Sequence, residues 1–218
     1  ELYPGKYLLR EISAPEGYIL NAEPREITVV SGITSAEIFN ERKKQEFKLK
    51  KELETDQKFG IGFNGEILNI RFGLFSKTEL TALDGSIIPA DGLIESASPD
   101  EDGFLSFTAD MPYNAECYIK ELETDGHYIL SDEQYLSGDT AENKIIRGSI
   151  EGLKTDPNGR VLKGAVIGLF YPFETEFSLD TALETFETDE TGRFSFENVP
   201  YGEWIIRELK APDGYILS

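Results

Sequence analysis

The sequence that decides the fold occurs twice almost unchanged. Residues 3–20 read YPGKYLLREISAPEGYIL, and residues 200–217 read PYGEWIIRELKAPDGYIL. Each copy alternates apolar and polar residues up to a glutamate and then enters an Ala-Pro-x-Gly-Tyr turn, which is typical of a strand followed by a tight turn. An altered copy, CYIKELETDGHY, occupies residues 117–128. This recurrence at domain-sized spacing predicts several copies of one β unit in series.

In each copy a tyrosine follows the glutamate by 7 residues; the pairs are Glu11 and Tyr18, Glu121 and Tyr128, and Glu208 and Tyr215. Glu208 is in phase with Trp204 and Ile206, so we expect it to face the same side of its strand. An unpaired charge on an apolar face is costly, because burial disfavours the ionised form. A buried glutamate therefore needs a partner or a chemical role.

A second repeated element places a lysine in phase with inward-facing positions. The two strands read Phe47-x-Leu49-x-Lys51 and Ile150-x-Gly152-x-Lys154. An asparagine stands eleven residues before each lysine, Asn40 before Lys51 and Asn143 before Lys154. A complete unit would therefore run from a Lys strand through a Glu strand to an Asn strand, and the next unit would begin at once. Alternation puts Lys48 and Lys50 on the face opposite Lys51.

Composition limits the function classes. The chain has 218 residues and a net charge of −20, which argues against nucleic acid and anionic lipid as partners. With a single cysteine, Cys117, and a single histidine, His127, we expect neither a disulfide framework nor a Cys/His zinc site. No apolar run reaches the length of a membrane span. Short alternating strands between Gly, Pro and Asp turns predict an all-β fold of sandwich type, with one weak helical candidate at residues 178–185.

These motifs resemble the Cna-B (SpaA-like, prealbumin-like) domains of Gram-positive surface adhesins and pilins. The Glu strand with its turn is similar to the family's E-box, although Thr124-Asp125 replaces Ala-Pro in the middle copy. The resemblance implies tandem Ig-like β-sandwiches. Residues 1–44 would be the C-terminal part of one domain, residues 45–147 a complete divergent domain, and residues 148–218 the N-terminal part of a third domain lacking its last strand.

The resemblance also implies a self-made covalent bond. In this family a lysine on the first strand attacks the side-chain amide of an asparagine on the last strand, the E-box glutamate relays protons, and ammonia leaves. Burial favours the neutral, nucleophilic lysine, and a protonated glutamate could polarise the asparagine carbonyl. In the middle unit Lys51 would be the nucleophile, Glu121 the shuttle and Asn143 the acceptor. The alternative is that Lys51 and Glu121 form a plain buried ion pair without a bond.

The outer units carry partial sets. Glu11 and Asn40 match the first unit, whose lysine would precede residue 1. Lys154 and Glu208 match the third unit, whose asparagine would follow residue 218. The chain thus reads as a segment of a tandem array, and neighbouring domains of that array would be its partners. Alternatively, the Asn40 strand of one molecule could complete the third unit of another copy.

The resulting expectation is a structural segment of a secreted adhesin, pilin or stalk at the cell surface or cell wall of a Gram-positive bacterium. It would need no cofactor or metal, and self-cross-linking would be a single event and not enzymatic turnover. The alternative function is an adhesin module that binds a host matrix protein or glycan through middle-unit loops 55–70 and 78–102. Gly60-x-Gly62-x-x-Gly65 matches the glycine pattern of a dinucleotide-binding motif, but no helix pattern follows it, so we interpret it as a loop.

Overall fold

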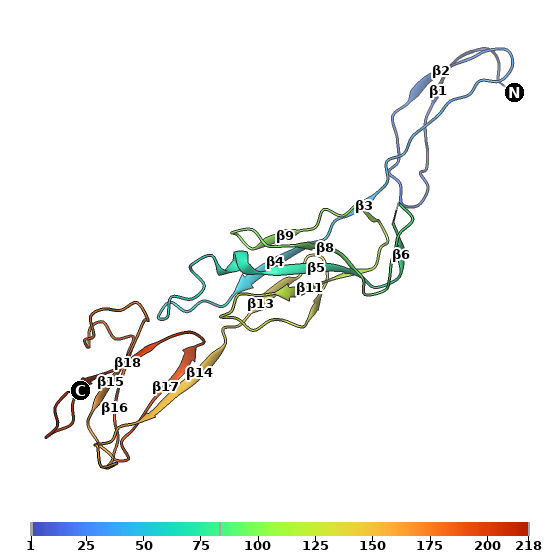
Figure 1. Cartoon of the computed structure of the whole chain (residues 1–218). Helices are drawn as coiled ribbons and strands as arrows, with labels where there is room; N and C mark the ends of the chain where they lie inside the picture. The colour runs from blue at the N-terminus through green and yellow to red at the C-terminus, as the bar shows by residue number, and fades with distance from the viewer. Residues whose placement is uncertain (1, 83, 218) are drawn as a thin grey trace.

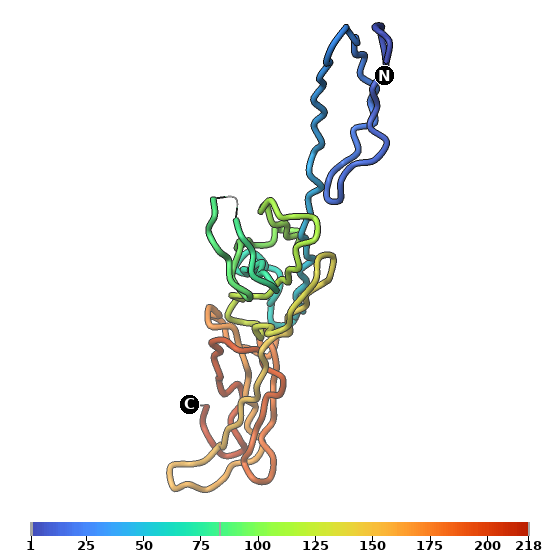
Figure 2. The backbone as a smooth tube through the Cα atoms, turned by 90° about the vertical axis from the view of Figure 1, so that its right-hand side faces the viewer, coloured from blue at the N-terminus to red at the C-terminus, as the bar shows by residue number. Residues whose placement is uncertain are grey.

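The computed structural model describes residues 2–82 and 84–217. The molecule is elongated, and three groups of strands follow one another along its long axis in chain order (Figures 1 and 2). Strands dominate all three groups; the single helical element in the described ranges is the short 3-10 helix η1, Glu66–Asn69. The predicted all-β class is therefore confirmed. Residues 178–185, the weak helical candidate, form a turn that leads into a strand.

The first group is a two-stranded hairpin. Strands β1 (Gly5–Leu9) and β2 (Arg25–Val29) pair antiparallel, with Gly5 opposite Val29. No second layer covers this hairpin among the described residues, so apolar side chains such as Ile12 and Ile33 stay 92% and 94% exposed. A two-stranded ribbon alone cannot bury an apolar face.

The middle group is a sandwich. Its strands are β3 (Lys44–Gln45), β4 (Lys48–Leu53), β5 (Arg71–Ser76), β6 (Leu80–Thr81), β7 (Ile87–Ile88), β8 (Leu93–Ala97), β9 (Phe104–Ser106), β10 (Met111–Pro112), β11 (Cys117–Glu123), β12 (Gln134–Tyr135) and β13 (Thr140–Asn143). One sheet has the order β12-β11-β5-β8 and the other has the order β13-β4-β9. In the second sheet β4 is antiparallel to β9 and parallel to β13.

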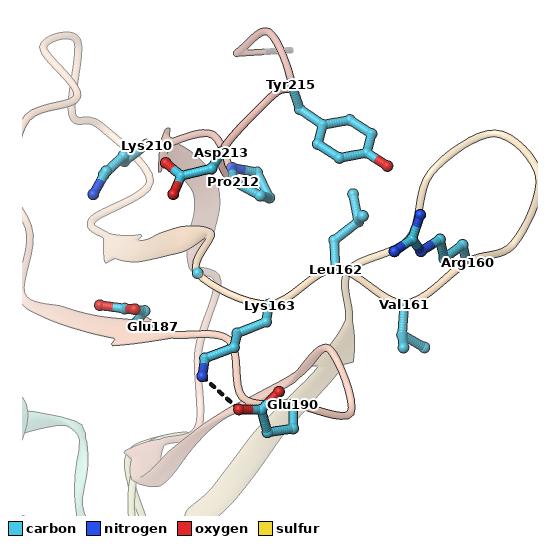
Figure 3. Close-up of a pocket in the computed structure, with 11 residues that line it drawn as sticks. Arg160, Val161, Leu162, Lys163, Glu187, Glu190, Lys210, Pro212, Asp213 and Tyr215 are labelled. Atoms are coloured by element: carbon cyan, nitrogen blue, oxygen red, sulfur yellow. Dashed lines mark hydrogen bonds and ion pairs between the residues drawn. The ribbon is translucent and has the colours of Figure 1, made fainter.

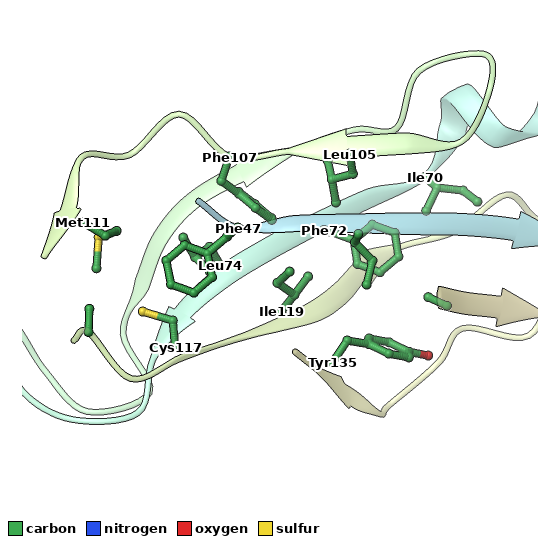
Figure 4. Close-up of a cluster of buried hydrophobic side chains, with 13 residues drawn as sticks. Phe47, Ile70, Phe72, Leu74, Leu105, Phe107, Met111, Cys117, Ile119 and Tyr135 are labelled. Atoms are coloured by element: carbon green, nitrogen blue, oxygen red, sulfur yellow. The ribbon is translucent and has the colours of Figure 1, made fainter. Parts of the chain in front are cut away.

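Between these sheets lies one apolar core (Figure 4). Phe72 and Leu74 of β5 and Ile119 of β11 are fully buried and meet Phe47 and Leu49 of β4. Cys117 is also buried in this cluster, as its phase on β11 predicts. Each inner strand therefore contributes alternate residues, as expected when one face of each sheet is covered.

The third group contains β14 (Arg147–Leu153), β15 (Val166–Phe170), β16 (Glu184–Glu187), β17 (Arg193–Pro200) and β18 (Ile205–Lys210). Strand β14 pairs with β17, and β15 lies between β16 and β18. Within the described ranges β14 has a strand partner on one side only, whereas β4 of the middle group has partners on both sides. Ile206, expected to share the inner face with Glu208, is 40% exposed on the edge strand β18.

The β4–β5 loop joins the middle and third groups. Phe59 and Ile61 of this loop are buried in the same apolar cluster as Ile167, Leu169 and Phe196 of the third group. The Phe59 ring lies 5.1 Å from the Trp204 ring in an edge-to-face arrangement. Loop 55–70, expected to be a binding surface, therefore has Phe59 and Ile61 buried at this junction, while other loop residues such as Phe63 remain exposed.

The second proposed binding loop also differs from expectation. Residues 78–102 contain the β6–β7 hairpin and strand β8, which pairs with β5 inside the main sheet. They are an elaborated part of the sandwich and not one long loop. In the part of the chain that the structure describes, no helix is long and apolar enough to cross a membrane.

Candidate functional site

The Lys51 side chain points into the middle core from strand β4. Phe47, Leu49 and Lys51 are 4%, 2% and 1% exposed, while Lys48 is exposed and Lys50 half-buried, so alternation selects the lysine as predicted. The backbone at Lys51 is held by a turn, because its N–H donates to the Gly103 carbonyl at 2.7 Å. A side chain at Gly103 would meet the Lys51 carbonyl oxygen at 2.2 Å, and its φ of +81° also favours glycine.

Glu121 reaches the same point from the opposite sheet. Its carboxylate lies 3.4 Å from Lys51 Nζ, and both side chains are completely shielded from solvent. The backbone N–H of Ser131 donates to Glu121 Oε2 at 2.8 Å, and this contact orients the carboxylate. Burial of both groups without solvent makes their mutual contact the main compensation for lost hydration.

Asn143, the last residue of β13, completes the cluster. Parallel pairing places Ala141 beside Lys51 and Asn143 beside Leu53, which brings the amide to the lysine. Lys51 Nζ donates to Asn143 Oδ1, and Asn143 Nδ2 donates to both Glu121 oxygens at 2.9 and 3.0 Å. The three residues predicted from spacing therefore meet in one buried cluster.

One detail corrects the sequence-based picture. We expected Glu121 to contact the asparagine carbonyl, but its oxygens accept hydrogen bonds from the amide nitrogen, and Lys51 contacts the carbonyl oxygen. The reason is geometric, since β11 brings the carboxylate to the nitrogen side of the amide while β4 brings the ammonium to the oxygen side. Glu121 therefore contacts the atom that would leave as ammonia.

Burial sets the electrostatics of Lys51. Desolvation lowers the pKa of its ammonium group below the ordinary value, and the attraction of Glu121 opposes this shift only in part. A lowered pKa increases the fraction of neutral amine near neutral pH, and only the neutral amine carries the lone pair that attacks a carbonyl carbon.

Glu11 and Asn40 are also in contact. Asn40 Nδ2 donates to Glu11 Oε2 at 2.7 Å and to the Ile19 carbonyl at 2.9 Å. The backbone N–H of Asn21 donates to Glu11 Oε2 at 2.8 Å, ten residues after the glutamate, as Ser131 does for Glu121. The first group therefore reproduces the Glu–Asn half of the middle cluster, and no lysine among the described residues hydrogen-bonds to either side chain.

Lys154 and Glu208 form the other partial set. Lys154 Nζ lies 3.0 Å from Glu208 Oε1, with side chains 23% and 6% exposed. The Lys154 backbone N–H donates to the Gly192 carbonyl at 2.8 Å, which repeats the contact between Lys51 and Gly103. A side chain at Gly192 would meet the Lys154 carbonyl oxygen at 2.7 Å. Two turns far apart in sequence thus fix two lysine strands in the same way.

Sequence reasoning missed one member of the middle cluster. Thr124 Oγ1 accepts a hydrogen bond from Asn143 Nδ2 at 2.8 Å. The available signal was the replacement of the E-box alanine by threonine at this position, since Ala14 and Ala211 stand there in the other copies.

A hollow of about 660 Å³ lies in the third group beside the Lys154 strand, since the N–H of its lining residue Leu162 donates to the Lys154 carbonyl at 2.9 Å (Figure 3). Cations and anions both line it, and Lys163 pairs with Glu190 at 2.5 Å. The E-box Tyr215 at its rim is 40% exposed, whereas its counterpart Tyr128 at the junction is 2% exposed.

The two outer groups of strands carry the near-identical repeat that opens and closes the chain, and comparison with known families identifies their class. The SpaA family, a prealbumin-like fold domain, matches residues 1–42 and 148–218, just over half of the chain. The chain therefore belongs to this family. Residues 43–147 lie outside the match, where the E-box copy is altered. No curated protein matches the chain.

Among solved structures, the Bacillus anthracis TIE protein is similar to the whole chain, with 24% identity and a TM-score of 0.70, and the chain spans 38% of that structure. The C-terminal fragment of the pilus adhesin SpaC from Lactobacillus rhamnosus GG matches 79% of this chain over 78% of its own length, with 13% identity and a TM-score of 0.46. BcpA, the major pilin subunit of Bacillus cereus, matches 97% of this chain over 75% of its own length, with 18% identity and a TM-score of 0.38. The first comparison shows a shared fold.

Proposed function

We propose that the chain is a structural segment of a Gram-positive cell-surface adhesin, pilin or stalk, built from tandem Cna-B-like domains and stabilised by a Lys–Asn isopeptide bond that it forms itself. The observation that carries the proposal is the buried contact of Lys51, Glu121 and Asn143. Membership of the SpaA family supports the structural role.

The reaction needs only these side chains. The Lys51 ammonium gives a proton to Glu121, and the neutral Nζ attacks Asn143 Cγ. The Cγ–Nδ2 bond then breaks as Glu121 returns the proton to Nδ2, and the second proton lost by Nζ follows the same route. The products are a secondary amide, ammonium and an unchanged Glu121 carboxylate. Holding the groups in contact supplies the high effective concentration that amide exchange requires.

The position of the bond gives it a mechanical purpose. Strands β4 and β13 are parallel neighbours, so a pulling force along the chain shears them past one another. A covalent link from Lys51 to Asn143 carries this force directly, and residues 52–142 are bypassed. The domain core then remains folded under tension that would otherwise separate its first and last strands.

Intact mass spectrometry tests the proposal. Bond formation removes one ammonia, so the measured mass should be about 17 Da below the sequence mass. The variants Lys51→Ala, Glu121→Ala and Asn143→Ala should each keep the full mass. Lys50→Ala is the matched control, because this neighbouring lysine lies on the other face, and it should show the wild-type loss. A full-mass wild type would leave Lys51 and Glu121 as a plain buried ion pair and overturn the bond.

The partial clusters fit the same scheme. We place domain boundaries near residues 44/45 and 147/148, at strand β3 and at the start of β14. In this arrangement a lysine from another strand would complete Glu11 and Asn40, and an asparagine strand beside β14 would complete Lys154 and Glu208. Neighbouring domains of the same array are the favoured source. Strand complementation by a second copy is the alternative, and it would appear as covalent dimers in the mass spectrum.

A second candidate function, binding of a host matrix protein or glycan, is supported by one observation. A hollow of about 470 Å³ lies at the junction of the middle and third groups. Its lining includes the aromatic residues Phe59, Tyr171, Phe173, Tyr201 and Trp204. Aromatic faces stack on sugar rings and anchor protein partners. A glycan array and a pull-down against matrix proteins, each repeated with Phe173→Ala, test this function.

A further inference from the structure

The middle cluster contains a fourth polar group that the Lys–Glu–Asn scheme does not use. We infer that Thr124 is a positioning residue that holds the leaving nitrogen of Asn143 during bond formation. This inference rests on the proposed function, because it concerns the rate of the same bond.

The position of Thr124 in the repeat is informative. It is the third residue after Glu121, and the equivalent residues after Glu11 and Glu208 are Ala14 and Ala211. The middle copy therefore has a hydroxyl where the two other copies have a methyl group. All copies share the turn that follows, in which the tyrosine N–H donates to the residue three positions before it. In the middle copy a register shift between Glu121 and Glu123 precedes this turn, and Thr124 lies between the shift and the turn.

The contact geometry shows what the hydroxyl does. Asn143 Nδ2 carries two hydrogens; it lies 2.8 Å from Thr124 Oγ1 and 2.9 and 3.0 Å from the two Glu121 oxygens. Threonine and glutamate together can accept both hydrogens. The amide is then fixed with its carbonyl oxygen toward Lys51, because a flipped amide would turn that oxygen toward the Glu121 carboxylate.

The first group offers a natural comparison. There Asn40 Nδ2 contacts Glu11 and the Ile19 backbone carbonyl, and the E-box residue is Ala14. The second acceptor for the amide nitrogen is thus a main-chain carbonyl in the unaltered copy and a side-chain hydroxyl in the altered one. The two arrangements differ chemically, because a carbonyl only accepts whereas a hydroxyl also donates.

This difference matters as the Cγ–Nδ2 bond breaks. The planar amide nitrogen offers only hydrogens, so Thr124 accepts. In the tetrahedral intermediate the nitrogen gains a lone pair, and the hydroxyl can rotate to donate to it. Once the nitrogen is protonated, the hydroxyl accepts again, so one side chain remains a hydrogen-bond partner throughout the step.

The experiment compares Thr124→Val, Thr124→Ala and Thr124→Ser with the wild type. Each full-length chain is isolated from inclusion bodies in urea, checked for full mass, and diluted into folding buffer; the loss of about 17 Da is followed with time. Loss of one hydrogen bond should slow the valine and alanine variants about tenfold, while serine stays within about twofold of wild type. Thr108→Val is the matched control: it removes a hydroxyl that donates to Glu95 at 2.8 Å elsewhere in the unit, and it should react at the wild-type rate.

The outcomes separate the two proposals. A wild type without mass loss overturns the bond itself, and the role of Thr124 with it. A wild type that reacts while Thr124→Val reacts equally fast leaves the bond intact and overturns only the positioning role. Equal slowing by serine and valine would also overturn it, because the change would then reflect packing and not the hydroxyl. Circular dichroism on each variant confirms folding, and alanine serves if valine fails to fold.

Discussion

The Phe59 ring of the middle group of strands lies edge to face against the Trp204 ring of the third group, with ring centroids 5.1 Å apart. Tyr171 extends this contact, since its ring centroid is 6.0 Å from that of Trp204 and its hydroxyl donates to the Lys58 carbonyl at 3.0 Å. Phe59 is 6% exposed although it belongs to a loop. The loop therefore packs into the junction, and we expect this contact to fix the middle and third groups relative to each other.

Removing the Phe59 ring should loosen the junction between the middle and third groups. Phe59→Ala leaves a cavity in a shared apolar cluster, and we expect it to cost about 3 kcal/mol of the free energy of unfolding. NMR relaxation should then give different rotational correlation times for the middle and third groups, whereas we expect one common correlation time in the wild type. Phe63→Ala is the control, because Phe63 in the same loop is 60% exposed. Equal correlation times for the two groups in Phe59→Ala would show that the Phe59 ring does not fix them relative to each other.

A second prediction concerns Gly62 in the same loop, where we expect a side chain to be poorly tolerated. Its φ is +90°, and a side chain there would meet Thr55 Cγ2 at 2.9 Å and the Tyr128 hydroxyl at 3.1 Å. Gly62→Ala should therefore combine backbone strain with a clash and lower the free energy of unfolding by about 2 kcal/mol or more. Gly65→Ala isolates the strain, because its φ is +81° but its nearest neighbour is Leu68 at 4.0 Å. Similar melting temperatures for both variants would show that the clash at Gly62 does not contribute to the loss of stability.

Arg147 should make the junction sensitive to acid. Its guanidinium lies 2.9 Å from Glu54 and 2.7 Å from Asp56, and its hydrogen bond lowers the pKa of Glu54 below the usual 4.5. A carboxyl group whose pKa is lower in the folded state than in the unfolded state stabilises the fold at pH values above its unfolded pKa. This stabilisation is lost as the pH falls through the folded pKa. The melting temperature should therefore fall below about pH 4.5 partly through this pair.

The test for Arg147 is a difference measurement. Arg147→Met should lower stability at pH 7 by about 1 kcal/mol, since all three side chains are partly exposed, and the gap from wild type should shrink between pH 5 and pH 3. Lys163→Met is the control, because it breaks the exposed pair with Glu190 outside the junction. A gap that stays constant with pH would argue against a role for the carboxylates.

Much of the candidate site was predictable because it depends on periodicity. Alternation selected Lys51 over Lys50, and the same alternation put Glu121 in phase with Ile119 in the core. Repeat spacing then pointed to Asn143, since strand order in a repeated fold is inherited with the repeat. The inward positions of Lys51 and Glu121 needed only the direction of a side chain relative to its own strand, whereas the grouping of these residues with Asn143 came from the repeat and the family resemblance.

The parts that were not predictable depend on contacts between distant segments. Phe59 and Ile61 lie in a loop with no period, so nothing local indicates that the third domain covers them. The contact of Thr124 with Asn143 requires the turn after β11 and the end of β13 to meet, and the approach of Glu121 to the amide nitrogen depends on the same geometry. The sequence pattern predicts on which face of a strand a side chain lies, but it does not predict which atom of another segment that side chain contacts.

Bond formation itself should depend on pH through Lys51. Burial lowers the pKa of this ammonium group, so at a given pH a larger fraction of Lys51 is neutral in the folded, unreacted unit than in the unfolded chain. The rate should rise as the pH increases toward the folded pKa and then level off, because further deprotonation adds no nucleophile. Refolding the urea-unfolded chain at pH 5 to 9 and timing the loss of about 17 Da gives this profile. By linkage, the unreactive Asn143→Ala variant should gain stability as the pH rises above the folded pKa of Lys51, because the unfolded chain still binds the proton that the folded unit has lost. A rate that is flat from pH 5 to 9, in a unit shown to be folded throughout, would contradict loss of the lysine proton to solvent before the attack and would leave direct transfer to Glu121 as the route.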